Sequence, residues 1–171
     1  MWISPNTDYY AAEMDEVFWF IKCRKDNDMG INTYIMTIIS RCPRQIIAFA
    51  VDNSVKAAII QQIVDSTKPF QKYFVDGCTV YRDVDYLGLL RQNCENKNDT
   101  YLVEGTNADL RHYIAGLRRK SRCFFRKFST LRAVLYVFIN AYNKFGEWKR
   151  NYFNKHPLAD RDLGFNHTRF I

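Results

Sequence analysis

The sequence predicts an α/β fold with a central mixed five-stranded sheet flanked by helices. Short runs of β-branched and aromatic residues alternate with segments of helical periodicity along the chain. Short connections join the first three runs, which favours an antiparallel meander, and helical segments separate the later ones. Hydrophobic residues make up 47% of the 171 positions, which is enough for the core of one domain.

The strands of the meander are expected at 13–22, 31–40 and 45–51. The first, EMDEVFWFIK, is dominated by aromatic and β-branched residues, as in a buried strand. A charged turn over 23–30 and a shorter turn over 41–44 join the three strands.

The remaining elements alternate between helix and strand. Asp52, Asn53 and Ser54 provide an N-cap for a helix over 55–66. The elements expected after it are a strand at 72–75, a helix at 79–92, a polar loop at 93–99, a short strand at 100–103, a helix from Glu104 to about Arg122 and a helix at 124–145. Residues 1–11 are interpreted as a lead-in and 146–171 as a tail outside the domain at 12–145.

The helix that follows Glu104 is predicted to be amphipathic. Its apolar face is formed by Leu110, Tyr113, Ile114 and Leu117. The opposite face carries Glu104, Asn107, Arg111, Arg118 and Arg122. The acid at the start of this helix could hold a metal ion, and the arginines on the same face could hold a polyanion beside it. This face therefore indicates a metal ion next to a bound polyanion.

This element order is that of the ribonuclease H-like fold, in which three carboxylates converge. Asp15 lies within the first strand, Asp76 ends an apolar strand, and Glu104 follows a short strand. Each acid alone has an ordinary explanation: Asp15 on an edge strand facing water, Asp76-Gly77 as a turn, and Glu104 at a helix start. Only the three together, in this element order, indicate a site. Glu13 shares the strand face of Asp15 and could assist it, whereas Glu16 is expected to face the other way and pair with a basic group.

Two or three such carboxylates, about 4 Å apart, would hold a pair of Mg²⁺ ions, with Mn²⁺ able to substitute. Magnesium requires oxygen ligands, which agrees with the absence of Cys or His clusters from the sequence. Five widely spaced cysteines and no apolar run of transmembrane length indicate a cytoplasmic protein with no membrane partner. Binding to DNA would make it nucleoid-associated.

The charge distribution indicates a nucleic-acid partner. The net charge is +7, and no acidic residue occurs between Asp109 and Glu147. Basic residues segregated in one segment are typical of phosphate binding, although a merely basic surface is the alternative. The basic residues of this segment are Arg111, Arg118, Arg119, Lys120, Arg122, Arg126, Lys127, Arg132 and Lys144.

Several of these segments resemble the catalytic part of insertion-sequence-one type transposases. They are AEMDE at 12–16, Val75-Asp76-Gly77 with Tyr81 four residues beyond it, and the segment from Glu104 through Asn107 and Arg111 to Arg118-Arg119-Lys120-Ser121. This family of DDE recombinases has a ribonuclease H-like core and belongs to the retroviral integrase and transposase superfamily. The resemblance implies that Asp15, Asp76 and Glu104 are the catalytic, metal-binding acids. It also implies that Asn107, Arg111, Arg118, Arg119 and Lys120 match the family's helix beyond the glutamate. These residues and Arg122 are the expected DNA contacts.

Two features depart from the family pattern. The interval from Asp76 to Glu104 is a few residues longer, which indicates an insertion in the loop at 93–99. The amino-terminal zinc-binding and helix-turn-helix region of the family is not found in this sequence, so an amino-terminal half is expected as a partner. By analogy with the family, the chain is also expected to act as a dimer or larger multimer on element ends and target DNA.

The sequence therefore predicts a Mg²⁺-dependent DDE transposase domain that cleaves DNA strands and transfers them. Two alternatives remain open. One is another nuclease of the same fold, such as a junction resolvase or ribonuclease H, and the other is a non-catalytic or domesticated DNA-binding protein.

Overall fold

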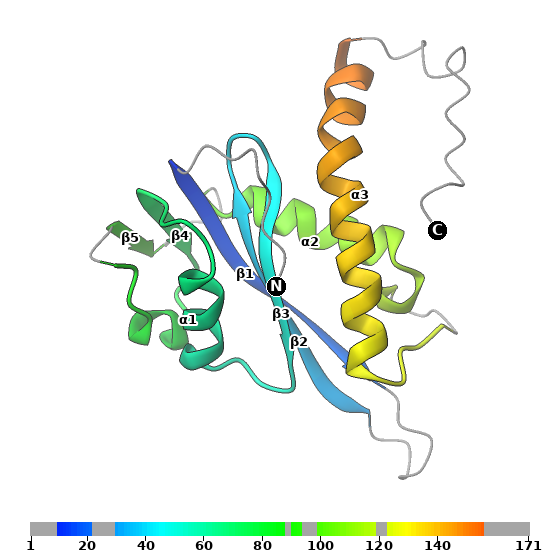
Figure 1. Ribbon diagram of the computed structural model, residues 1–171, viewed down its shortest axis with the longest axis horizontal. Helices are drawn as coiled ribbons and strands as arrows, with labels where there is room; N and C mark the ends of the chain where they lie inside the picture. The colour runs from blue at the N-terminus through cyan, green and yellow to red at the C-terminus, as the bar shows by residue number, and fades with distance from the viewer. Residues whose placement is uncertain (1–9, 22–29, 88–89, 94–98, 119–122, 156–171) are drawn as a thin grey trace.

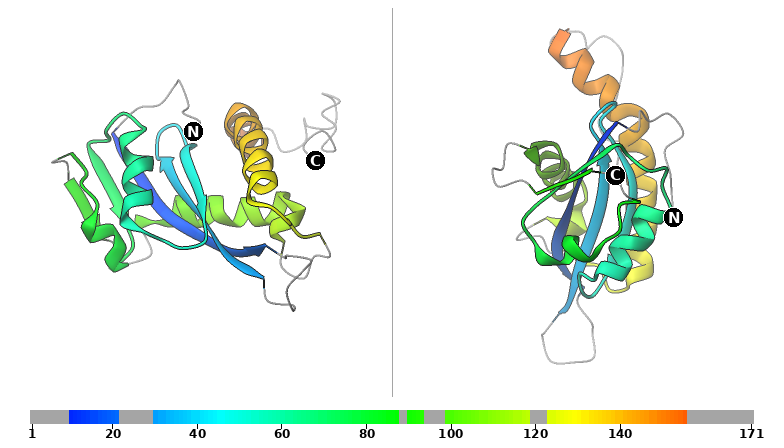
Figure 2. Two further views of the ribbon diagram at one scale, coloured as in Figure 1. Left: turned by 60° about the horizontal axis from the view of Figure 1, so that its bottom comes forward. Right: turned by 90° about the vertical axis from the view of Figure 1, so that its left-hand side faces the viewer.

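The computed structural model describes residues 10–21, 30–87, 90–93, 99–118 and 123–155. The strands form one mixed five-stranded sheet, with helices packed on both of its faces (Figures 1 and 2). This confirms the predicted architecture. No helix in the described ranges is both long enough and apolar enough to cross a membrane.

The predicted antiparallel meander is confirmed. Its strands are β1 (Ala11–Ile21), β2 (Ile31–Ser40) and β3 (Gln45–Asp52). Strand β1 pairs antiparallel with β2 along its whole length, and β2 pairs with β3 through a bulge between Ile38 and Ile39. Because β1 is central and apolar on both faces, it is the strand on which the rest of the fold is built.

Two short parallel strands extend the sheet on the other side of β1. They are β4 (Lys72–Val75), which pairs with β1, and β5 (Leu90–Asn93), which pairs with β4. The complete strand order is β3-β2-β1-β4-β5. The fifth strand was therefore predicted in the wrong place, since the apolar run at 100–103 enters a helix instead. The helix predicted over 79–92 is wrong too: a 3-10 helix, η1 (Thr79–Asp83), and β5 lie within that range.

Alternation along β1 divides the core into two clusters. Ala12 and Met14 face the helix α1 (Ala57–Asp65) and η1, together with buried residues of β2, β3 and β4. Val17, Trp19 and Ile21 face α2 (Tyr101–Tyr113) and α3 (Phe128–Lys155) on the opposite side (Figure 2). From Ala12 to Val17, odd-numbered residues of β1 thus point towards α2 and even-numbered residues towards α1 and η1.

Helix α2 differs from its predicted form at both ends. It begins at Tyr101, before Glu104, and ends at Tyr113, where a short 3-10 turn η3 (Ala115–Leu117) follows. The prediction of one continuous helix to Arg122 was therefore wrong. Leu110 in α2, Ile114 just after it and Leu117 in η3 are all buried in the core, as the periodicity predicted, but Tyr113 is exposed.

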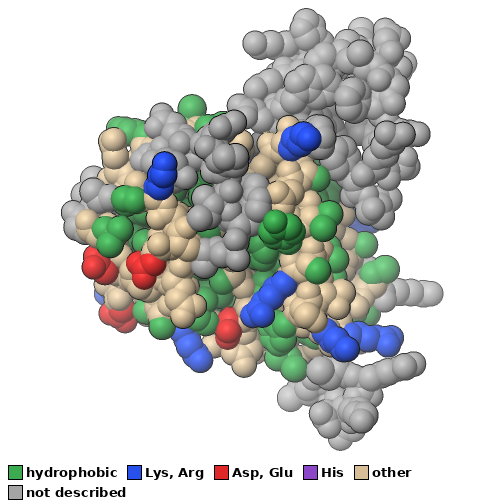
Figure 3. Space-filling view, in the orientation of Figure 1, with side chains coloured by type: hydrophobic (Ala, Val, Ile, Leu, Met, Phe, Trp, Pro, Cys, Tyr) green, Lys and Arg blue, Asp and Glu red, His purple; other side chains and the backbone are tan. Residues whose placement is uncertain are grey.

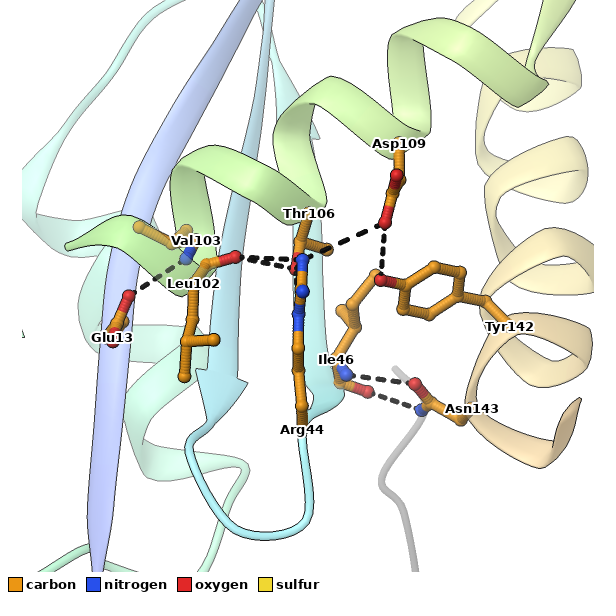
Figure 4. Close-up of polar contacts among 9 residues, drawn as sticks. All are labelled: Glu13, Arg44, Ile46, Leu102, Val103, Thr106, Asp109, Tyr142 and Asn143. Atoms are coloured by element: carbon orange, nitrogen blue, oxygen red, sulfur yellow. Dashed lines mark hydrogen bonds and ion pairs between the residues drawn. The ribbon is translucent and has the colours of Figure 1, made fainter. Parts of the chain in front are cut away.

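Helix α3 begins later and ends later than the predicted 124–145 and crosses the edge strand β3. The side-chain amide of Asn143 accepts a hydrogen bond from the Ile46 backbone N–H at 2.9 Å and donates one to the Ile46 carbonyl at 2.8 Å (Figure 4). Arg132 donates to the Val51 carbonyl at 2.8 Å. Two side chains of α3 thus satisfy backbone groups along β3 that a further strand would otherwise pair with.

Candidate metal centre

Three carboxylates meet where β4 ends beside β1. Asp15, Glu16 and Asp76 each offer an oxygen within 4.8 Å of the others. Asp15 and Asp76 were predicted to converge, and Glu16 was not. Among the residues that the structure describes, Glu104 is not part of this group.

The sheet topology explains why two adjacent residues of β1 reach one place. The pairing of β1 with β4 ends at Met14 opposite Val75, so Asp15 and Glu16 lie just beyond the last paired residue of β4. Asp76 leaves the sheet at that point and turns back, since its Oδ1 accepts a hydrogen bond from the Cys78 N–H at 2.9 Å. Side chains from both faces of β1 can therefore approach the space at the end of β4.

The prediction that Glu16 pairs with a basic group was wrong. Its Oε2 accepts a hydrogen bond from the hydroxyl of Tyr81 in η1 at 2.8 Å, on the even-numbered face of β1. It is Glu13 that pairs with a basic group: its carboxylate is fully buried and accepts a bond from Nε of Arg41 at 2.8 Å. Alternation correctly predicted the face of β1 on which each acid lies. The sequence does not show that β4 ends opposite Met14, one residue before Asp15.

Glu13 also fixes the start of α2. Its second oxygen accepts a hydrogen bond from the backbone N–H of Val103 at 2.9 Å (Figure 4). The N-cap residue, Thr100, makes no side-chain capping bond, so the carboxylate from β1 satisfies one of the free N–H groups of the first turn. A negative charge is favourable at this end of a helix.

Arg44 adds a second connection between the β2–β3 turn and α2. Its guanidinium donates to Oγ1 of Thr106 at 2.9 Å and to the Leu102 carbonyl at 3.3 Å, and lies 3.8 Å from Asp109 (Figure 4). Asp109 in turn accepts a bond from the Tyr142 hydroxyl at 2.8 Å, which connects α2 to α3. Helix α2 is thus held from three elements, and its side chains are fixed relative to β1.

Asn107 contacts the acidic group from α2. It is 3% exposed, and its Nδ2 donates to Oδ2 of Asp15 at 2.8 Å. Its Oδ1 is buried and has no hydrogen-bond partner among the described residues. The same holds for Oγ1 of Thr37, which lies directly opposite Asp15 in the β1–β2 register. Unpartnered buried oxygens are rare, and both of these belong to neighbours of Asp15.

Ionising the acids of this group together is unfavourable, because they are partly buried and lie close to one another. Burial, and after it the negative charges of Glu16 and Asp76, raise the pKa of the Asp15 carboxyl from 3.8 to about 6. Burial and the charge of Asp76 also raise the pKa of Glu16, although the bond from Tyr81 acts in the opposite direction. Burial raises the pKa of the Tyr81 hydroxyl well above its ordinary value, so this hydroxyl stays a donor.

The remaining predicted site residues lie on or after α2. Glu104 is exposed in its first turn, one turn before Asn107, and residues three apart lie on the same side of a helix. Arg111 is half-buried in α2, and Arg118 is exposed after η3. Arg119, Lys120 and Arg122 lie outside the described residues.

The chemistry of the acidic group suits a hard divalent cation. All three donors are carboxylate oxygens, as Mg²⁺ and Mn²⁺ prefer. No ion pair joins any of them to a Lys or Arg in the described ranges. A hydrated ion would also bring water molecules that can donate hydrogen bonds to the unpartnered oxygen of Asn107. The residues present therefore fit such an ion.

The structure is similar to solved complexes of the Mos1 transposase. They are a paired-end complex with left transposon end (13% identity, TM-score 0.53, covering 82% of this chain and 51% of that chain), a Strand Transfer Complex (14%, 0.52, 82% and 50%) and a pre-cleavage transpososome (13%, 0.53, 82% and 51%). This chain thus spans about half the length of the Mos1 chains. At this identity the similarity establishes the fold, which is ribonuclease H-like as predicted. No protein-family model matches the sequence, and no curated protein matches it at a significant level.

Proposed function

We propose that this chain is the catalytic domain of a DNA transposase of the insertion-sequence-one type, which cleaves DNA strands and transfers them with the help of divalent metal ions. The observation that carries the proposal is the meeting of Asp15 and Asp76 at the end of β4, beside an α2 side chain bonded to Asp15. The fold in which they meet is shared with the Mos1 transposase complexes.

The acids predicted from the sequence have distinct places in this proposal. Asp15 and Asp76 hold the metal ions, with Mg²⁺ as the physiological ion and Mn²⁺ as a substitute. Glu104 completes the set from α2. Its position is supported by Asn107, because the side of α2 that carries Asn107 faces Asp15 and Glu104 lies one turn earlier on that side.

The ions, when bound, would activate the attacking oxygen and stabilise the leaving oxygen of a phosphodiester. The contribution of the chain is to fix the ligands in advance. Glu13 anchors the start of α2 to β1, and Asn107 orients one oxygen of Asp15. Rigid placement of charged groups is what catalysis of phosphoryl transfer requires, since most of the barrier is lowered by positioning and electrostatics.

DNA would be held by the basic segment that begins at Arg111 in the last turn of α2. Arg111 and Arg118 belong to it, together with Arg119, Lys120 and Arg122. Figure 3 shows further Lys and Arg side chains at the amino-terminal end of α3, whereas Asp and Glu side chains on this face lie mainly towards α1. Asn107, which the family resemblance places among the DNA contacts, is buried against Asp15, and we assign it to ligand positioning instead. Paired element ends would require a dimer or larger multimer.

Nicking of supercoiled plasmid tests the proposal. The purified chain should nick the plasmid only with Mg²⁺ or Mn²⁺, and Asp76→Asn should abolish nicking while DNA affinity is kept, because the variant loses a ligand but no basic residue. Equal loss of nicking and DNA affinity would contradict the metal role of Asp76. Preferred cleavage of RNA–DNA hybrids or four-way junctions would identify another nuclease of the same fold. DNA binding without any metal-dependent nicking would favour a non-catalytic DNA-binding protein.

A further inference from the structure

We propose that Glu16 is an additional ligand of the metal centre, held in place by the hydroxyl of Tyr81. This inference rests on the proposed function and extends the set of acids beyond Asp15, Asp76 and Glu104. It assigns a role to a residue that the alternation of β1 directs away from Asp15.

The position of Glu16 is the first argument. It is the residue after Asp15, on the opposite face of β1, yet one of its oxygens lies within 4.8 Å of oxygens from both Asp15 and Asp76. This is possible because β4 is paired with β1 only as far as Met14 and Val75. Asp15 therefore approaches the end of β4 from the α2 face and Glu16 from the η1 face, so an ion placed there would be enclosed from both sides of the sheet.

The comparison between Glu16 and Glu13 is the second argument. Both acids belong to β1, but Glu13 is neutralised by Arg41 and by the N–H of Val103. Glu16 has a neutral hydroxyl as its hydrogen-bond partner, and no Lys or Arg forms an ion pair with it in the described part of the chain. The charge of Glu13 is thus balanced within the fold. No described basic residue balances the charge of Glu16, and a divalent cation would supply that counterion.

Unpartnered polar atoms on buried side chains beside the cluster are the third argument. The side chain of Asn107 is 3% exposed and its amide is directed at Asp15, yet its Oδ1 has no hydrogen-bond partner in the described ranges. Oγ1 of Thr37, 1% exposed and opposite Asp15, is unpartnered as well. An ionised carboxylate cannot donate a hydrogen bond, so the acids alone leave the amide oxygen of Asn107 unsatisfied. The unpartnered atoms indicate that a further species belongs beside these acids.

Tyr81 is held firmly enough to position Glu16. Its side chain is 1% exposed, and the η1 backbone that carries it is fixed by a bond from its own N–H to the Cys78 carbonyl at 3.2 Å. The Tyr86 hydroxyl donates to the Tyr81 carbonyl at 3.2 Å. The hydroxyl of Tyr81 donates to Oε2 of Glu16, which leaves acceptor positions of the carboxylate available to a metal ion. Such outer partners fix the orientation of metal ligands.

Metal binding, measured apart from activity, tests the assignment. The variants are Glu16→Gln and Tyr81→Phe, with Asp83→Asn as the matched control, because Asp83 is an exposed acid of η1 outside the cluster. The rise in melting temperature on titration with Mn²⁺ gives the metal affinity of each variant without DNA. Nicking of supercoiled plasmid as a function of Mn²⁺ concentration gives the second readout.

We expect Glu16→Gln to raise the Mn²⁺ concentration at the midpoint of both titrations at least about tenfold, and Tyr81→Phe to raise it by a smaller factor. Asp83→Asn should match the wild type. Midpoints that stay at the wild-type value in both Glu16→Gln and Tyr81→Phe would overturn the inference, even if Asp76→Asn has lost nicking and the proposed function stands. A wild-type chain that neither nicks DNA nor responds to Mn²⁺ would overturn both.

Discussion

The Nδ2 atom of Asn107 lies 2.8 Å from Oδ2 of Asp15, which joins helix α2 to the central strand across 92 positions of the sequence. We predict that Asn107→Ala reduces metal-dependent nicking by on the order of 10–100-fold, since a residue that orients a metal ligand has been lost. Stability should change by less than about 1.5 kcal/mol, because the lost hydrogen bond is offset by removal of the unpartnered Oδ1. Parallel urea unfolding and plasmid nicking measure the two effects. A loss of stability large enough to explain the lost nicking would contradict a positioning role.

Asp15 should make the metal-free protein less stable as the pH rises. Its pKa is about 6 in the folded state and 3.8 as the ordinary value, so the folded state binds the proton more tightly than the unfolded state. The ionised carboxylate therefore lowers stability, beginning as the pH rises through 3.8 and fully above about 6. Asp15→Asn, which cannot ionise, should melt close to the wild type at pH 4 and clearly above it at pH 7.5, both without metal. A difference in melting temperature that is the same at both pH values would exclude this effect.

Glu13 should contribute to stability in the way that an N-cap residue does in other helices. Glu13→Gln removes the charge that pairs with Arg41 and faces the first turn of α2, and we expect it to cost about 1.5–3 kcal/mol. Thr100→Ala is the contrasting variant. An N-cap threonine is ordinarily worth roughly 1 kcal/mol, but Thr100 makes no capping bond and its hydroxyl should contribute little. Equilibrium unfolding of both variants checks the contrast, which would be refuted if Thr100→Ala were the more damaging change.

The elements predicted correctly from the sequence are those with a long apolar pattern that does not depend on distant contacts. Strands β1, β2 and β3 carry apolar residues over eight or more positions each, and their short connections determine the pairing. The run at 100–103 is too short for its periodicity to distinguish a strand from a helix. The group that makes it a helix start is the carboxylate of Glu13 on β1, a tertiary contact that no local pattern contains.

Only part of the candidate site was predicted, because the rest also depends on contacts that no local sequence pattern contains. Asp15 and Asp76 follow from the element order, because one lies on the central strand and the other directly follows its parallel neighbour. Glu16 was missed because alternation separates neighbouring residues only where an adjacent strand continues beside them. Here the neighbouring strand ends at Val75, and this length is set by where the chain turns at Asp76. The presence of Tyr81 close after Asp76 was the signal in the sequence, since a buried hydroxyl needs an acceptor.

Asn143 should protect the outer edge of the sheet. Asn143→Ala leaves the Ile46 N–H and carbonyl without their partners, and we expect a loss of about 1–3 kcal/mol. Asn143→Asp should be at least as damaging, because a carboxylate can accept from the N–H but repels the carbonyl oxygen, and the position is 7% exposed. Equilibrium unfolding and hydrogen exchange at the Ile46 amide measure the effect. Wild-type protection of that amide in Asn143→Ala would show that α3 does not cap β3.

Arg118 should contact a phosphate of the DNA backbone, so its contribution to binding should not depend on the base sequence. It is exposed directly after η3, in the segment that lacks acidic residues. Arg118→Ala should lower DNA affinity and reduce the slope of log K against log salt by roughly 0.9, the value for one lost phosphate contact, and adding Arg119→Ala should reduce it further. Arg82→Ala is the control, because Arg82 is an exposed arginine of η1 outside the basic segment. If Arg82→Ala and Arg118→Ala changed the slope equally, the effect would come from net charge alone, and the basic segment would not be the DNA-binding surface.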